Sequence, residues 1–257
     1  MVMFLLIVIA LISGITLGSL FTPRTSIVYN TTISEGYEDF AYTTQLFCEG
    51  IPDPRHSTFS SVVIPAVDTE GNGITTRMFV QTFPGSGRVL TNIDRLLFWV
   101  DTQNSIRRAT QIAENLTGMN LGGYDIVYTI QANASVIGGP SAGAAIAIVT
   151  IAALQNKTIN DSVIITGSVN HDGTIGPVGN IVEKAIASKE AGAELFLVPL
   201  AQSTEVTYRT REYCEKIGWV DWCSTETYPV KLDIEEEAGL SVKEVMDIGE
   251  AAEYMLI

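Results

Sequence analysis

The strongest constraint on the fold is an alternation of strand-like and helix-like segments through the second half of the chain. β-branched runs alternate with segments whose apolar residues recur at helical spacing. In chain order these segments are strand 124–131, helix 141–155, strand 162–169, helix 180–190 and strand 195–198. This alternation predicts an α+β domain in which helices pack on a mixed sheet.

The regions on either side add a hairpin and two further elements. Residues 59–71 and 73–83 are rich in β-branched and aromatic residues, and Glu70-Gly-Asn-Gly predicts the turn of a hairpin between them. Helical spacing from about Asn92 predicts a long helix after the hairpin. Near the C-terminus we expect a strand at 228–234 and then a closing helix within 241–256.

The N-terminus carries an apolar run without a charged side chain, Met1 to Phe21. Its length is close to the roughly 20 residues that a helix needs to cross a bilayer. We therefore expect a transmembrane anchor or signal sequence at 1–21, a stalk or lead-in at 22–55 and the folded domain at 56–257. An uncleaved anchor is favoured because the basic n-region of a signal peptide is missing.

Sequence features conflict on which side of the membrane the folded domain lies. Arg24, after the apolar run, weakly favours a cytoplasmic domain. Cys214 and Cys223 are spaced to close a short disulfide loop, which would leave Cys48 unpaired. Glycosylation acceptor triplets, which mark exposed loops of secreted proteins, begin at Asn30, Asn115, Asn133, Asn156 and Asn160. We expect a single-pass membrane protein with an extracytoplasmic domain.

The acidity of the chain excludes one class of partner. The formal net charge is −14, whereas nucleic-acid binding requires clustered Lys and Arg. We therefore expect no nucleic-acid partner, and the plain interpretation of the acidity is solubility.

A candidate nucleophile, Ser141, lies in the stretch IGGPSAGAAIAI, where a turn of small residues enters an apolar helix. A serine at this junction is either a helix cap or a nucleophile near backbone N–H groups that stabilise an oxyanion. A nucleophile also needs a base. The chain has two histidines, of which His171 precedes the turn pair Asp172-Gly173 and His56 borders the lead-in.

A lysine is the other candidate base. In the helix predicted from Asn180, Lys184 is the one charged residue on a face that it shares with Ile181, Ala185 and Ser188. One interpretation is a lysine that buries its stem and keeps its amine in water. The alternative is a buried amine that resists protonation and serves as a general base at neutral pH.

The motifs GGPSAG, ITGSV and DGTIGPVGNIVEKAIASKEAGAELFLVP, in this order, resemble the proteolytic domain of the Lon family. The resemblance runs from about Ser60 to the C-terminus. It implies a Lon-type fold and a Ser-Lys dyad of Ser141 and Lys184, with Thr166 hydrogen-bonded to the lysine. It also implies an oxyanion turn made by the backbone at Gly139, Pro140 and Ala142, in which Pro140 lacks an N–H.

Two departures from the family pattern bear on function. Gly138 occupies a position that is often acidic in Lon proteins, and no GxxxxGK[ST] loop for ATP exists in the chain. The resemblance is thus to membrane-anchored, Lon-like serine proteases of archaea that lack the ATPase. It implies ATP-independent cleavage of unfolded or extended polypeptides, no metal or organic cofactor, and a ring-shaped homo-oligomer.

Two rival interpretations remain open. One is a catalytically silent Lon-like domain that binds peptides or assembles at the membrane, and the other is a protease subunit that recruits an ATPase. The loop Phe83-Pro84-Gly85-Ser86-Gly87 either borders the site or is a plain turn.

Overall fold

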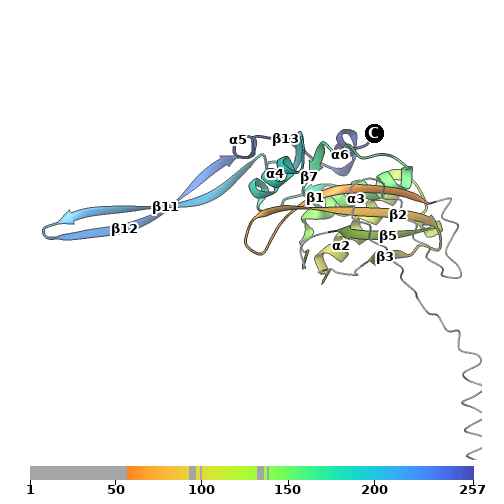
Figure 1. Cartoon of the computed structure of the whole chain (residues 1–257), viewed down its shortest axis with the longest axis horizontal. Coiled ribbons are helices and arrows are strands. Elements are labelled where there is room, and N and C mark those ends of the chain that lie inside the picture. The colour runs from red at the N-terminus through yellow and green to blue at the C-terminus, as the bar shows by residue number, and fades with distance from the viewer. Residues whose placement is uncertain (1–56, 93–96, 99, 132–135, 138) are drawn as a thin grey trace, which may run out of the picture. The chain divides into compact units, whose positions relative to one another are not determined.

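The computed structural model describes residues 57–92, 97–98, 100–131, 136–137 and 139–257 (Figure 1). The expected anchor and stalk lie outside the described residues. Within the described part, no helix is both long enough and apolar enough to cross a membrane.

The main sheet has four strands in the order β1-β2-β5-β3, which run side by side in Figure 1. Strands β1, β2 and β5 are antiparallel neighbours, and β3 pairs parallel with β5. Their bounds are β1 Thr58–Val67, β2 Gly73–Pro84, β3 Val89–Asn92 and β5 Tyr124–Gln131. The predicted hairpin is confirmed, since β1 and β2 pair from Thr58↔Thr82 to Val67↔Gly73.

A second sheet has three parallel strands in the order β13-β10-β7. Their bounds are β7 Val163–Ile165, β10 Leu195–Pro199 and β13 Ser241–Val245. The strands β4, β6, β8 and β9 form short pairs with the bounds Leu97–Phe98, Val136–Ile137, Ser168–Val169 and Ile175–Gly176. A long antiparallel ribbon consists of β11 Thr204–Ile217 and β12 Val220–Asp233.

The helices of the described residues are α2 Val100–Thr117, α3 Gly143–Gln155, α4 Ile181–Glu190, α5 Ile234–Ala238 and α6 Ile248–Met255. Two single turns of 3₁₀-helix, η2 Leu121–Gly123 and η3 Pro140–Ala142, precede β5 and α3. The predicted α+β class, with a mixed sheet and packed helices, is confirmed.

The core is centred on α3, which contacts β1, β2, α2 and α6. Every residue of α3 from Gly143 to Leu154 is buried, so this helix is apolar on all sides because it is covered on all sides. One polar link crosses the core: the Tyr128 hydroxyl of β5 is 3.0 Å from Thr110 Oγ1 of α2 and 2.9 Å from Thr150 Oγ1 of α3. The link satisfies hydroxyl groups that would be costly to bury alone.

Two predicted helix boundaries are wrong. The helix expected from about Asn92 begins at Val100, because Asn92 ends β3 and Leu97–Phe98 pairs with β6. The closing helix expected within 241–256 is helical only from Ile248, because Ser241–Val245 pairs with β10 as a strand. In both cases pairing with a distant strand overrides the local pattern.

Candidate active site

Ser141 lies in η3, the tight turn that enters α3. Gly139 precedes it with φ = 103°, a left-handed conformation that favours glycine, and Pro140 opens the turn. Gly143 follows Ser141 by two residues. A Cβ atom at this position would lie only 2.9 Å from the backbone nitrogen of Val169, so a larger residue would not fit without a shift. The small residues of PSAG therefore let the turn and the helix approach β8 closely.

Ser141 is not a helix cap in the described structure. The N-cap residues of η3 and α3 are Gly139 and Ala142, and no side-chain hydrogen bond caps either element. Of the two interpretations of this serine, the cap lacks the hydrogen bond that would define it.

The backbone of Ser141 is joined to the end of β7. The N–H of Gly167 donates to the carbonyl oxygen of Ser141 at 3.0 Å, and Thr166 Oγ1 donates to the same oxygen at 3.5 Å. The N–H of Ala144 donates to Gly167 O at 3.0 Å. Thr166 is fully buried. In this structure the Thr166 hydroxyl therefore holds the serine turn, whereas the resemblance assigned it to the lysine.

Lys184 lies on the inner face of α4, as predicted, with Ile181, Ala185 and Ser188 also buried. The lysine is 5% exposed, and its Nζ donates to the carbonyl oxygen of Gly179 at 2.8 Å. Burial lowers the pKa of Lys184, and the nearby carboxylates of Glu205 and Glu183 oppose that shift only in part. The amine is therefore easier to deprotonate than an ordinary lysine.

One open pocket of about 460 Å³ brings these residues together. Its lining consists of Pro140, Ser141, Pro177, Val178, Gly179, Asn180 and Lys184. Ser141 and Lys184 thus face the same space from η3 and α4. No hydrogen bond joins Ser141 Oγ to Lys184 Nζ among the described residues, where the amine instead donates to Gly179.

Two side chains on this side of the molecule were missed by sequence reasoning. Gln202 makes two hydrogen bonds to the backbone of Val178, and Glu205 accepts hydrogen bonds from the first N–H groups of α4. Asn180 occupies the N-cap position of α4, where Asn is a favoured residue. Asn180 adopts φ = 56° and caps nothing with its side chain, which leaves the N–H groups to Glu205.

The histidines and the loop that the sequence offered for the active site do not line the Ser141 pocket within the described residues. His171 is an exposed residue of the turn between β8 and β9, as its sequence context favoured, and His56 lies outside the described residues. The loop 83–87 does not line the Ser141 pocket; Gly87 lines a separate pocket of about 320 Å³. That loop is held by Asp125, which accepts hydrogen bonds from the N–H groups of Ser86 and Arg88, both at 2.9 Å.

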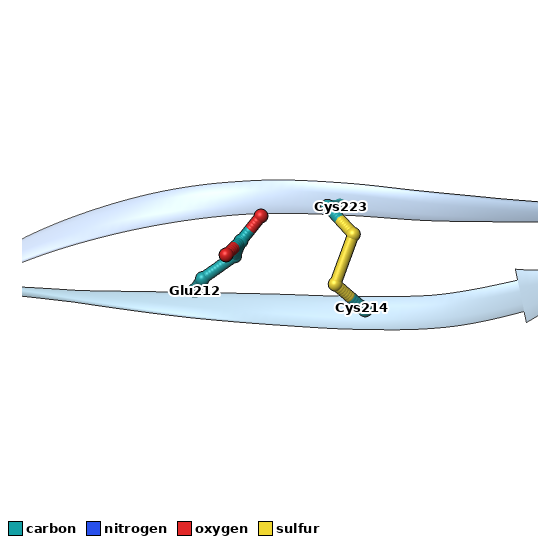
Figure 2. Close-up of side chains that lie close together, drawn as sticks. All are labelled: Glu212, Cys214 and Cys223. Carbon is teal, nitrogen blue, oxygen red and sulfur yellow. A yellow bond between two sulfur atoms is a disulfide. The ribbon is translucent and has the colours of Figure 1, made fainter.

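A cluster on the ribbon has the residue types of a metal site but a different chemistry. Ligand atoms of Glu212, Cys214 and Cys223 lie within 4.8 Å of one another. Figure 2 shows the two cysteines bonded across the ribbon, with Glu212 beside them. The predicted Cys214–Cys223 disulfide is therefore confirmed, and its sulfurs are not the thiolates that bind metals.

Residues 104–219 match a family model described as the Lon protease (S16) C-terminal proteolytic domain. The match includes Ser141, Thr166 and Lys184. The chain is similar to the archaeal Lon protease of Thermococcus kodakarensis, with 28% identity over 129 residues, which are 50% of this chain and 19% of that protein.

Two further relatives are similar over shorter stretches. The archaeal Lon protease of Methanothermobacter thermautotrophicus is 28% identical over 104 residues, 40% of this chain and 16% of that protein. The Lon protease of Phenylobacterium zucineum is 33% identical over 100 residues, 38% of this chain and 12% of that protein. The chain therefore spans less than a fifth of the length of these relatives.

Proposed function

The chain carries a Lon-family proteolytic domain, and on that premise we propose that it is a serine peptidase with Ser141 as nucleophile and Lys184 as general base. The observation that carries the proposal is the shared pocket. Ser141 and Lys184 line it together, and the lysine is almost fully buried, which disfavours its charged form.

The hydrogen bond from Lys184 to Gly179 suits a base. A neutral amine has two N–H bonds and one lone pair, and donation to Gly179 O at 2.8 Å uses one of the N–H bonds. The lone pair stays free to accept the proton of the Ser141 hydroxyl. Ser141 and Lys184 line the same pocket, and catalytic hydrogen bonds often tighten only when substrate binds. We propose that the lone pair meets Oγ in the complex with substrate.

In the proposed reaction Ser141 Oγ attacks the peptide carbonyl carbon while Lys184 Nζ takes the hydroxyl proton. Lys184 then gives this proton to the leaving amine as the C–N bond breaks. Water, deprotonated by Lys184, hydrolyses the acyl-enzyme and restores Ser141. The N–H groups at Gly139 and Ala142 are the candidates for binding the oxyanion, at the start of a helix where N–H groups lack intrahelical partners.

We assign Thr166 to the positioning of the serine. Its hydroxyl and the N–H of Gly167 both bond the Ser141 carbonyl oxygen, which ties the serine turn to the second sheet. The orientation of Lys184 is supported instead by Gly179, through the hydrogen bond to its carbonyl.

We further propose that the substrates are unfolded or extended polypeptides, since a folded chain cannot lay its backbone into such a pocket. Cleavage is proposed to be independent of ATP, and the protein to be held at a membrane by Met1 to Phe21, with a ring of copies as the assembly. The Cys214–Cys223 disulfide supports an extracytoplasmic location, because disulfides persist in oxidising compartments.

The test is hydrolysis of a fluorescently labelled, denatured protein by the purified full chain without ATP. Ser141→Ala and Lys184→Met each remove one reacting group with little change in volume, and we expect each to lower kcat by about 10³-fold or more. Added ATP is expected to leave the rate unchanged. Cleavage that survives both substitutions would reject the dyad.

A second candidate function is a peptide-binding domain without catalysis. It is favoured by the hydrogen bond of Lys184 to Gly179 in place of Ser141, and by Gly138, where Lon proteins often carry an acidic residue. It predicts that the unaltered chain binds the denatured substrate but releases no fragments. Product analysis by mass spectrometry separates the two functions.

A further inference from the structure

Two side chains lie against the wall of the Ser141 pocket: Gln202 from the loop between β10 and β11, and Glu205 from the start of β11. Gln202 Nε2 donates to Val178 O at 2.7 Å, and Val178 N donates to Gln202 Oε1 at 2.9 Å. Glu205 Oε2 accepts from the N–H groups of Ile181 at 3.1 Å and Val182 at 3.2 Å. Val178 lines the pocket, and Ile181 begins the helix that carries Lys184.

Helix α4 depends on this outside partner for its first turn. The N–H groups at the start of a helix have no intrahelical acceptor, and Asn180 provides none through its side chain. A carboxylate at this end also faces the positive end of the helix dipole. The conformation of the first turn also fixes the position of the Lys184 amine. The amine donates a hydrogen bond to the carbonyl oxygen of Gly179, which lies just before the helix.

The loop is itself anchored to the second sheet. Glu244 of β13 accepts a hydrogen bond from the N–H of Ser203 at 2.9 Å. Its hydrogen bonds with Ser203 and the neighbouring backbone hold the pKa of the Glu244 carboxyl below its usual value, so the anchor stays ionised. A continuous set of contacts therefore runs from β13 through Ser203 to Glu205 and α4.

We propose that Glu205 is a positioning residue for the peptidase reaction, which holds the first turn of α4 in place and sets a negative charge beside the Lys184 amine. This inference rests on the proposed function. Glu205 reaches the site from β11, a strand that local sequence patterns do not connect with the helix of the lysine.

The two roles of Glu205 predict different effects. Two charged groups act on Lys184 within the described residues: Glu205 from β11 and Glu183 from α4 itself. Helix α4 also packs against β1, β2 and α5, and none of these three elements supplies a further charged group that acts on Lys184. Both carboxylates oppose the effect of burial on the pKa of Lys184, so removing either charge lowers that pKa further and leaves more neutral amine at a given pH.

The experiment compares three variants of the full chain. Glu205→Gln keeps an oxygen that accepts hydrogen bonds but removes the charge, Glu205→Ala removes both, and Glu183→Gln removes a charge that caps nothing. We measure kcat against pH with a denatured substrate, and the titration of Lys184 by NMR of ¹³C-labelled lysine. Far-ultraviolet circular dichroism verifies that each variant is folded.

We expect Glu205→Gln and Glu183→Gln to retain kcat at the plateau within about threefold and to move the acidic limb of the profile to lower pH. The Lys184 titration should move in the same direction. Glu205→Ala should lose at least about tenfold in plateau kcat with little change in KM, because a small displacement of a reacting group is costly.

The inference is overturned if Glu205→Ala keeps the plateau kcat, or if Glu205→Gln leaves both the acidic limb and the Lys184 titration where they were. Failure of the proposed function is seen separately, as undiminished cleavage by Ser141→Ala. The NMR titration needs no catalysis, so it measures the effect of Glu205 on Lys184 in either case.

Discussion

At the residue scale, two buried ionisable groups have opposite electrostatic surroundings. Asp125 is nearly buried and carries the hydrogen bonds of Arg88 and Ser86, which hold the pKa of its carboxyl at about 2. Burial lowers the pKa of Lys184, and the carboxylates of Glu205 and Glu183 compensate for that effect only in part. The Asp125 carboxylate stabilises the fold as an anion, whereas the Lys184 amine loses its proton more readily than an ordinary lysine.

The Asp125 carboxylate should stabilise the protein in a pH-dependent manner. Its folded-state pKa, about 2, lies below the unfolded value of 3.8, so its stabilisation is complete above about pH 4 and disappears as the pH falls toward 2. We expect Asp125→Asn to lower the free energy of unfolding by roughly 2 kcal/mol at pH 7. Urea unfolding at several pH values measures this difference, and a difference that stays constant down to pH 2 would contradict it.

At the scale of elements, the ribbon of β11 and β12 differs from the rest of the domain. Every residue from Tyr208 to Thr227 is exposed, including Trp219 and Trp222 at and near the turn. The ribbon is held by strand pairing, by the disulfide and by Arg211, which pairs with Glu226. Since the outer ribbon adds little buried area, its stability should be largely independent of the core.

Removal of the disulfide should therefore act locally. We expect Cys214→Ser with Cys223→Ser to move the main thermal transition by less than about 2 °C, while trypsin cleaves faster after Arg211 and Lys216. Cys48→Ser is the matched control for loss of a cysteine. Differential scanning calorimetry and mass spectrometry of the fragments report the two effects. A fall of more than about 5 °C in the main transition would show that the ribbon stabilises the core.

At the scale of the whole molecule, the sequence predicts what local patterns encode. The hairpin of β1 and β2, the buried helix after Ser141 and the inward face of α4 with Lys184 follow from turn residues and apolar periodicity. These segments specify their own conformation, and two of them carry the proposed reacting groups. The pocket that unites Ser141 and Lys184 follows only from the folded chain.

The missed features depend on partners far away in the sequence. The sequence of β13 predicts part of a helix, but in the folded chain this segment pairs with β10 as a strand. Strand β11 has no apolar periodicity because both of its faces are exposed to solvent. Glu205 caps a helix that begins 24 residues earlier. Long-range pairing of this kind has no local signal in the sequence.

The measurement that tests the central claim most directly is the labelling of the full chain with a peptidyl fluorophosphonate, read by mass spectrometry. An activated serine displaces fluoride, and the phosphonyl group stays on its oxygen. The account predicts one adduct, on Ser141, absent in Ser141→Ala and formed at least about 10²-fold more slowly in Lys184→Met. An adduct on another residue, or labelling of Ser141 that is as fast without Lys184, would contradict it.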